Sequence, residues 1–225
     1  LLGLAIPGVE LDVLIVDDDS PDGTGRLADR LAAQAAGRVA VVHRTGKRGL
    51  GSAYIEAFGR ALDDGAELVA QMDADLSHDP GALAAMVGAI ADHDVVIGSR
   101  YMPGGAVDTG WNRLRKLISR TANRAVVPFL LTLPVTDATS GYRLWRRDAL
   151  LRIAPATSVR SSGYGFQVEM AYLAHRLGCR IAEVPILFRE RGSGQSKMDL
   201  RVALAAVRDI VVIRFRPPGA RAGGR

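Results

Sequence analysis

The feature that most constrains the fold is an apolar stretch that ends in closely spaced acids. Residues 67–72 read as a buried strand, and Asp73 and Asp75 follow one residue apart. Ligands of α/β proteins bind at the carboxyl edge of the sheet. Two carboxylates there suit a hard divalent cation, Mg²⁺ or Mn²⁺, shared with phosphate oxygens. Taken alone, the segment also fits a solvated turn followed by a helix cap at Asp79.

The periodicity around this stretch predicts an α/β fold with a doubly wound, mostly parallel sheet and a small antiparallel part. Strands are expected at 12–17, 39–43, 67–72, 94–98 and 180–188, with a short antiparallel strand within 136–147. Helices are expected at 25–36, 53–63, 80–91, 112–132, 166–177 and 199–214. With 225 residues, 48% of them hydrophobic, the chain can bury a full core, so we expect one domain over 1–214 and a disordered tail over 215–225.

The composition limits the kinds of ligand and partner that the protein can be expected to bind. The net charge is +5, with acids gathered in the first half and arginines in the second, which favours an anionic ligand. Aromatic residues make up only 5% and are not interleaved with the arginines, which argues against nucleic acid as a partner. The single Cys179 excludes an internal disulfide and a cysteine metal cluster. We find no apolar run long enough for a membrane-spanning helix.

Four further groups carry chemistry that suits a nucleotide and phosphates. Asp17 and Asp18 end the first strand, where acids accept hydrogen bonds from a ribose or a base. The glycine-rich loop 44–52 holds three cations before a helix, a pattern that favours phosphates. The third group can hold a phosphate monoester and consists of Arg100, Arg113, Arg115, Lys116 and Ser119. The fourth is the Gly/Ser loop 188–197, whose cations can close over a diphosphate as a lid. Each group alone also fits a solvated charged surface.

Together these segments resemble the polyprenol-phosphate mannosyltransferases, the dolichol-phosphate mannose synthases and their bacterial counterparts, among the family 2 glycosyltransferases. The resemblance runs from about residue 12 to residue 200 and rests on five motifs in order. They are Val-Asp-Asp-x-Ser-Pro-Asp-Gly-Thr, Arg-x-Gly-Lys-x-Gly-Leu-Gly-Ser-Ala-Tyr, Gln-Met-Asp-Ala-Asp-Leu-Ser-His-Asp-Pro, Ile-Gly-Ser-Arg-Tyr and Thr-Ser-Gly-Tyr-Arg. The family's opening Pro-Thr-Tyr-Asn-Glu type motif is absent, so the first strand of the sheet is expected to be missing.

The resemblance implies a GT-A-like fold and a role for each matched residue. Asp73 and Asp75 resemble the pair that holds the donor diphosphate through Mg²⁺ or Mn²⁺; position 77 is Ser where some members have Gln. The implied donor-binding residues are Asp17, Asp18, Gly46, Lys47, Arg189, Arg191, Ser196 and Lys197. The implied acceptor-phosphate residues are Arg100, Arg115 and Ser119. Asp137 stands where other family 2 enzymes keep a base and is expected to position the sugar.

The implied reaction is inverting transfer of mannose from GDP-mannose to a polyprenyl monophosphate. The acceptor is an anion near neutral pH, because a phosphate monoester has a second pKa of about 6, so no histidine is nominated as a base. The resemblance also implies a cytoplasmic enzyme, peripheral on the cytoplasmic face of the membrane, with a membrane-anchoring partner protein as one means of attachment. Two rivals stay open: a UDP-sugar donor with the same acceptor, and a non-catalytic, truncated nucleotide-sugar-binding homologue.

Overall fold

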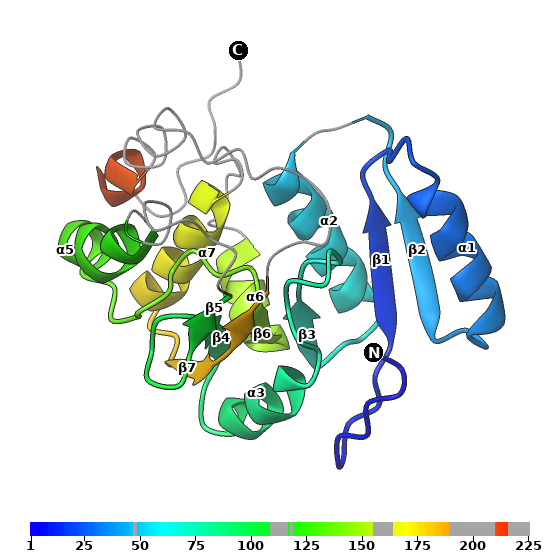
Figure 1. The fold of residues 1–225 in the computed structure, drawn as a ribbon, viewed down its shortest axis with the longest axis horizontal. Helices are drawn as coiled ribbons and strands as arrows, with labels where there is room; N and C mark the ends of the chain where they lie inside the picture. Colours follow the sequence, from blue (N-terminus) through cyan, green and yellow to red (C-terminus); the bar gives the residue numbers. More distant parts are fainter. Residues whose placement is uncertain (47–48, 109–116, 118, 155–163, 190–209, 216–225) are drawn as a thin grey trace. The chain divides into compact units, whose positions relative to one another are not determined.

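The computed structural model describes residues 1–46, 49–108, 117, 119–154, 164–189 and 210–215, and the chain divides into two compact units, Leu1–Ala66 and Glu67–Arg225 (Figure 1). We call them unit 1 and unit 2. The predicted domain over 1–214 stays a prediction. Of the predicted tail over 215–225, residue 215 continues a helix from residue 210 and residues 216–225 lie outside the described residues. Residues 199–209 of the predicted helix over 199–214 also lie outside them, and residues 210–214 are helical.

Unit 1 is built on two parallel strands. Its elements are β1 (Val13–Asp17), α1 (Thr24–Gln34), β2 (Val39–His43) and α2 (Leu50–Asp63). β1 and β2 pair with Val13 opposite Val39 and Asp17 opposite His43. The Asp22 carboxylate accepts hydrogen bonds from the Thr24 backbone N–H at 3.0 Å and from its hydroxyl at 2.6 Å, an Asx-type turn directly before α1. Residues 1–12 form turns and irregular backbone without a strand.

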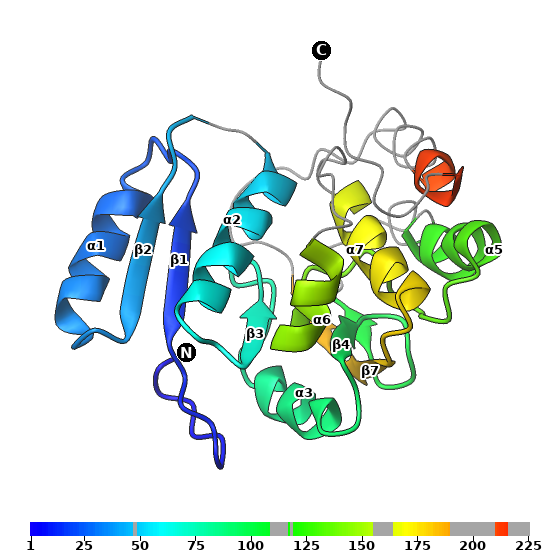
Figure 2. The ribbon, with the colours of Figure 1, turned by 180° about the vertical axis from the view of Figure 1, so that it is seen from behind.

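Unit 2 contains the larger sheet. Its strands are β3 (Leu68–Gln71), β4 (Val95–Ser99), β5 (Ala106–Val107), β6 (Arg143–Arg146), β7 (Ile181–Pro185) and β8 (Leu187–Phe188). Its helices are α3 (Ala82–Ile90), α5 (Val127–Leu131), α6 (Arg147–Ile153) and α7 (Tyr164–Arg176), with a π-helical turn, η1 (Ala122–Val126), before α5. Figure 2 shows α3 on one side of the sheet and α6 and α7 on the other.

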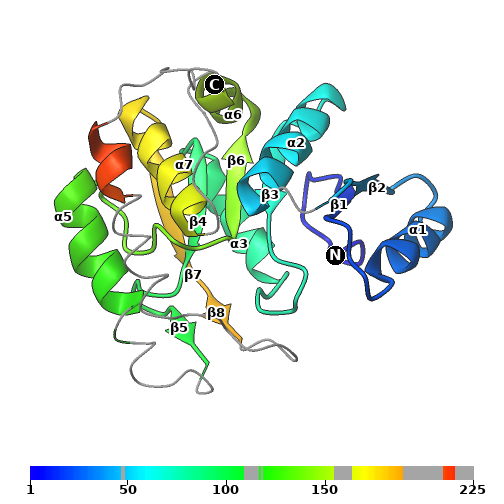
Figure 3. The ribbon, with the colours of Figure 1, turned by 90° about the horizontal axis from the view of Figure 1, so that it is seen from above.

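The strand directions bring several loops to one edge of this sheet. The order is β3-β6-β4-β7, and β6 runs antiparallel to both β3 and β4, while β4 and β7 are parallel. The carboxyl ends of β3, β4 and β7 therefore meet at the same edge, which is also where β6 begins. β5 and β8 form a separate parallel pair just beyond β4 and β7 (Figure 3).

The predicted α/β architecture is confirmed, including the short antiparallel strand within 136–147. Two elements differ in detail. The expected strand over 180–188 is split into β7 and β8, with Ile186 between them. The described part of the expected helix over 112–132 is helical up to Leu131 but contains the π-helical turn η1. Within the part of the chain that the structure describes, we find no helix with the length and hydropathy of a membrane span.

Candidate active site

A loop that carries two acids follows β3, and we call residues 73–78 the acid loop. The Asp73 backbone N–H donates to His78 Nδ1 at 3.1 Å, which closes the loop on itself. Within it, Asp75 Oδ1 accepts from the Ser77 N–H at 3.1 Å and from the Ser77 hydroxyl. Leu76 has a positive φ of 66° and is 83% exposed at the tip. Both carboxylates remain partly exposed on an ordered turn.

His78 anchors the acid loop to the body of unit 2. Its side chain is buried, with the ring centroid 5.2 Å from that of Tyr142 and 5.3 Å from that of Phe188. Burial lowers the pKa of His78 below its usual value of 6.5, although Asp73 acts in the opposite direction. Arg100 also lowers this pKa. The neutral ring, which accepts from the backbone at Nδ1, is therefore the form that fits this position.

Four predicted site residues lie within electrostatic reach of His78: Asp73, Asp75, Arg100 and Asp137. They come from the ends of β3 and β4 and from the loop before β6, which the strand directions bring to one edge. The sequence analysis nominated no histidine as a base and gave His78 no role. Its position three residues after Asp75 is the only local signal, because its packing partners are distant in sequence.

Arg100 and Asp137 contact each other. Arg100 Nε donates to Asp137 Oδ2 and Nη2 to Oδ1, both at 2.7 Å, and the Arg100 backbone N–H donates to Oδ2 at 3.0 Å. The side chains are 4% and 0% exposed, so the pair is taken out of water almost completely. The sequence assigned Arg100 to the acceptor phosphate and Asp137 to the sugar. The structure joins the two in one buried ion pair, and their separate roles stay predictions.

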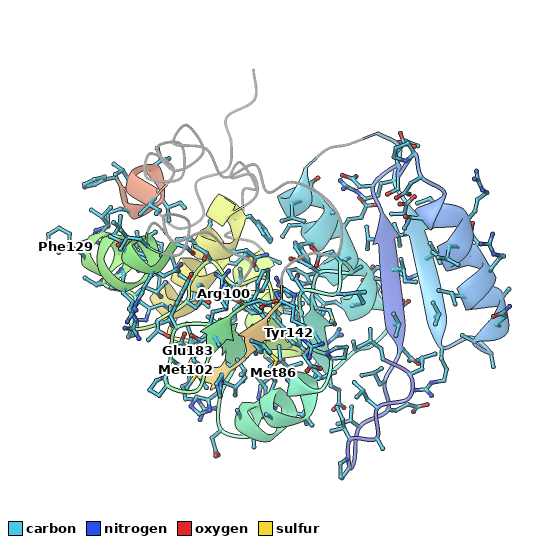
Figure 4. The ribbon with its side chains drawn as sticks, in the orientation of Figure 1. Met86, Arg100, Met102, Phe129, Tyr142 and Glu183 are labelled. Carbon is cyan, nitrogen blue, oxygen red and sulfur yellow. The ribbon has the colours of Figure 1, made fainter. Side chains whose placement is uncertain are left out.

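Glu183, a residue that the sequence interpretation missed, holds the loop that carries Asp137. Its carboxylate accepts from the Thr136 N–H at 2.8 Å, the Thr136 hydroxyl at 2.9 Å and the Asp137 N–H at 3.0 Å. Figure 4 labels Glu183 and Arg100 among the side chains of unit 2. Glu183 lies on β7 opposite Ile97 of β4, so only the strand pairing reveals this contact.

Ser119, predicted to bind the acceptor phosphate, is buried beside the same group. Its hydroxyl accepts from the Tyr101 hydroxyl at 2.6 Å, and its backbone oxygen accepts from Asn123 Nδ2 at 3.0 Å. The same Asn123 nitrogen donates to Thr139 Oγ1 at 2.9 Å, which in turn accepts from Arg100 Nη2 at 2.8 Å. Hydrogen bonds therefore connect Ser119 to Arg100. Arg115 lies outside the described residues, as do Arg113 and Lys116.

Arg189 lies next to the acid loop. Its backbone N–H donates to the Ser77 carbonyl at 3.0 Å, and its Nη2 is 3.9 Å from Asp79 Oδ2. The guanidinium is exposed and so can meet an anion. Of the other residues of the predicted closing loop, Arg191, Ser196 and Lys197 lie outside the described residues.

In unit 1, Asp17 and Asp18 occupy the carboxyl end of β1 as predicted. Asp17 is buried, and its Oδ2 lies 3.8 Å from His43 Nδ1. A Cβ on Gly25 would come within 2.6 Å of this oxygen, so glycine leaves the room that the carboxylate occupies. Asp17 Oδ1 is buried without a hydrogen-bond partner among the residues that the structure describes, which leaves it able to accept from a ligand.

Asp18 is held by Arg44, the first cation of the glycine-rich loop. Arg44 Nη1 donates to Asp18 Oδ1 at 2.6 Å, and other guanidinium nitrogens donate to Ser52 and Glu56. The Arg44 side chain is fully buried, so it organises the loop rather than facing solvent. Gly46 takes a positive φ of 71° at the turn, and Lys47 lies outside the described residues.

The acid loop fits a divalent cation that is shared with a substrate. Within the described residues, no group of three or more His, Cys, Asp or Glu side chains forms a complete protein cage for a metal. A cation of the Mg²⁺ type needs only one or two carboxylates when substrate phosphates supply further oxygens. A Cβ on Gly141 would lie 3.4 Å from Asp73 Oδ1, so the backbone before β6 passes close to this carboxylate.

Comparison with known proteins identifies the family. A model of glycosyl transferase family 2 matches residues 4–153. The chain therefore belongs to the family 2 glycosyltransferases and is a glycosyltransferase, as its motifs predicted.

Two curated relatives cover most of the chain. It is 48% identical over 194 residues to the undecaprenyl-phosphate mannosyltransferase of Micrococcus luteus, covering 86% of this chain and 77% of that protein. It is 46% identical over 190 residues to the polyprenol monophosphomannose synthase of Mycolicibacterium smegmatis, covering 84% of this chain and 71% of that protein. The predicted resemblance to polyprenol-phosphate mannosyltransferases is confirmed.

Solved structures confirm the GT-A-like fold. Glucosyl-3-phosphoglycerate synthase from Mycobacterium tuberculosis, in complex with Mn²⁺, uridine diphosphate and phosphoglyceric acid, matches with a TM-score of 0.61 at 19% identity, covering 92% of this chain and 68% of that one. A mannosyltransferase from Pyrobaculum calidifontis, in complex with GDP-Man and Mn²⁺, matches with a TM-score of 0.55 at 20% identity, covering 87% of this chain and 52% of that one. At these identities the likeness concerns the fold alone.

Proposed function

We propose that this glycosyltransferase moves mannose from GDP-mannose to a polyprenyl monophosphate, with inversion at the anomeric carbon. The structural observation that carries the proposal is that the acid loop, with Asp73 and Asp75, and the pair of Arg100 and Asp137 lie at one edge of the sheet, where His78 and Arg100 both contact the Phe188 ring. Carboxylates and an arginine beside one another suit a metal-bound diphosphate and a second anionic group. The two curated relatives, which are named for mannose transfer to a polyprenyl phosphate, support the choice of sugar and acceptor.

In this proposal the reaction is a single displacement. An oxygen of the acceptor phosphate forms a bond to the anomeric carbon while the bond from that carbon to the GDP oxygen breaks, and GDP leaves with the electron pair. The acceptor is largely dianionic near neutral pH, so no protein base has to remove a proton. Catalysis then depends on placement of the two substrates and on neutralising the charge that develops on the departing diphosphate.

Each side of the reaction has its own residues in this proposal. Asp73 and Asp75 hold Mg²⁺ or Mn²⁺, which supplies positive charge to the diphosphate when it is bound. Donor contacts are assigned to Asp17, Asp18, Gly46, Lys47, Arg189, Arg191, Ser196 and Lys197. Acceptor contacts are assigned to Arg100, Arg115 and Ser119. Because Asp137 binds the Arg100 guanidinium through two hydrogen bonds, we assign it the task of orienting that arginine as well as the sugar.

The proposed setting follows from the acceptor. A polyprenyl chain resides in a bilayer, so we place the enzyme peripherally on the cytoplasmic face of a membrane, with an anchoring partner protein as one means of attachment. UDP-sugars and GDP-mannose present the same diphosphate to the acid loop, so a UDP-sugar is the alternative donor.

Transfer from radiolabelled GDP-mannose to a polyprenyl phosphate tests the proposal. We expect label in the lipid fraction with GDP-mannose, none with UDP-glucose or a UDP-linked aminosugar, and a product of opposite anomeric configuration to the donor. Transfer from a UDP-sugar alone would replace the donor. Absence of transfer from every donor would support the non-catalytic binding alternative instead.

A further inference from the structure

Two helical segments of unit 2 expose large apolar side chains. The first comprises residue 117 and residues 119–131, and the second is residues 210–215. Phe129 is 84% exposed, Phe215 82%, Leu117 62% and Val212 57%. Figures 1 and 3 both show α5 next to the segment 210–215, so the two segments lie side by side in unit 2. A gathering of exposed apolar side chains marks an interaction surface more often than single ones do.

These side chains point outward because the opposite faces of both segments are packed. In the first segment the buried residues are Ser119, Asn123, Val127 and Leu131, which are spaced four apart along one face. In the second, Ile210 and Ile213 are buried, and Arg214 Nη1 lies 3.5 Å from the Tyr172 hydroxyl of α7. The exposure is therefore a consequence of how these segments dock on unit 2.

Cations accompany the apolar side chains. Arg120 and Arg124 of the first segment and Arg214 of the second are exposed. Residues 117–131 and 210–215 contain no aspartate or glutamate. Aromatic and aliphatic side chains mixed with arginines, without acids, are typical of segments that lie in the interface of an anionic bilayer. This composition favours a lipid surface over a second protein as the occupant.

The inner face of the first segment reaches the candidate active site. Ser119 accepts from Tyr101, and Asn123 donates to Thr139, which accepts from Arg100. One helical segment thus presents Phe129 to the outside while its buried side contacts residues assigned to the acceptor phosphate. A surface that rests on a bilayer at this place would keep those residues close to a phosphate carried by a membrane lipid.

We propose that Leu117, Phe129, Val212 and Phe215, with Arg120 and Arg124, form a docking face that rests on the headgroup region of an anionic bilayer. The inference deepens the proposed function, on which its biological role rests. The phenylalanines enter the interface between headgroups and acyl chains, and the arginines contact lipid phosphates while their apolar stems lie along the surface.

Vesicle co-sedimentation tests the docking face. The full chain is mixed with vesicles of phosphatidylcholine containing phosphatidylglycerol, or of phosphatidylcholine alone. We compare the wild type, the double variant Phe129→Ser/Phe215→Ser, and a control, Leu27→Ser/Leu31→Ser, which removes exposed leucines from α1 of unit 1. We expect the wild type and the control to bind the anionic vesicles alike. The partition coefficient of the phenylalanine variant should be lower by about tenfold or more. Arg120→Gln should weaken binding several-fold on anionic vesicles only.

Two readouts separate this inference from its rivals. Thermal melting and transfer to a short-chain, water-soluble polyprenyl phosphate should be unchanged in the phenylalanine variant, while transfer to a vesicle-embedded acceptor falls. Equal vesicle binding by variant and wild type would overturn the docking face. Loss of a dimer in sedimentation velocity, with vesicle binding unchanged, would overturn it in favour of a second copy of the chain. Vesicle binding without transfer in the wild type would refute the proposed function and leave the docking face in place.

Discussion

The buried pair of Arg100 and Asp137 makes a sharp prediction about stability. Asp137→Asn keeps the shape of the side chain but removes its charge and turns an amide donor toward the guanidinium. Asp137 is fully buried and accepts three hydrogen bonds from Arg100, so the variant removes the carboxylate charge that faces the guanidinium in a place that water does not reach. Breaking one side of a buried pair costs about 3–5 kcal/mol, and we expect a loss of that size in the free energy of unfolding.

Equilibrium urea unfolding, followed by tryptophan fluorescence, measures this loss, because Trp145 is buried in unit 2. The matched control is Asp148→Asn, which changes an exposed acid in the first turn of α6 and should shift stability by no more than about 0.5 kcal/mol. The double variant Arg100→Met/Asp137→Leu removes both charges and should cost much less than the two single changes added together. A loss below about 1 kcal/mol in Asp137→Asn would refute the idea that the pair is desolvated.

Two further predictions concern single residues of unit 2. In His78→Asn the amide oxygen can take the place of Nδ1 and keep the hydrogen bond from the Asp73 N–H, whereas in His78→Gln it cannot. Only the glutamine variant should therefore bind Mn²⁺ several-fold more weakly in the presence of GDP, as measured by electron paramagnetic resonance. Equal Mn²⁺ affinities of the two variants would contradict this anchoring role. Burial raises the pKa of Asp94, but hydrogen bonds from Arg180 and the charges of Arg180 and Arg152 outweigh it, and the pKa falls below its usual 3.8. Asp94→Asn should therefore lower the free energy of unfolding by about 1 kcal/mol at neutral pH. The difference between variant and wild type should disappear as the pH falls below 3.8 and the native carboxylate is protonated. A constant difference in urea unfolding down to pH 3 would contradict the lowered pKa.

The sequence predicted the elements whose signals are local. The strand at 39–43 lies where the apolar run placed it, and the acids at 73 and 75 follow β3 as expected. The antiparallel strand was predicted within 136–147, but its place between β3 and β4 was not. Strand order depends on side-chain packing between segments far apart in the chain, which hydrophobic periodicity does not encode.

The contacts within the candidate site were the least predictable part. Arg100 and Asp137 were both nominated, but nothing local shows that they pair, because 36 residues lie between them. Glu183 was missed, since its task is to hold backbone N–H groups of a loop that comes near only when β7 pairs with β4. Arg44 looked like a phosphate-binding cation in the sequence, whereas packing places it inside unit 1 with Asp18 and Glu56.

In the proposed mechanism, Asp73 and Asp75 hold a divalent cation that mannose transfer requires. Turnover of GDP-mannose with a polyprenyl phosphate should be measured in EDTA and after addition of Mn²⁺ or Mg²⁺, for the wild type and for Asp75→Ala. We expect the wild type to lose activity in EDTA and regain it with metal, and Asp75→Ala to stay inactive under all conditions while its urea unfolding changes little. Full activity of the wild type in EDTA, or of Asp75→Ala with metal present, would contradict the claim.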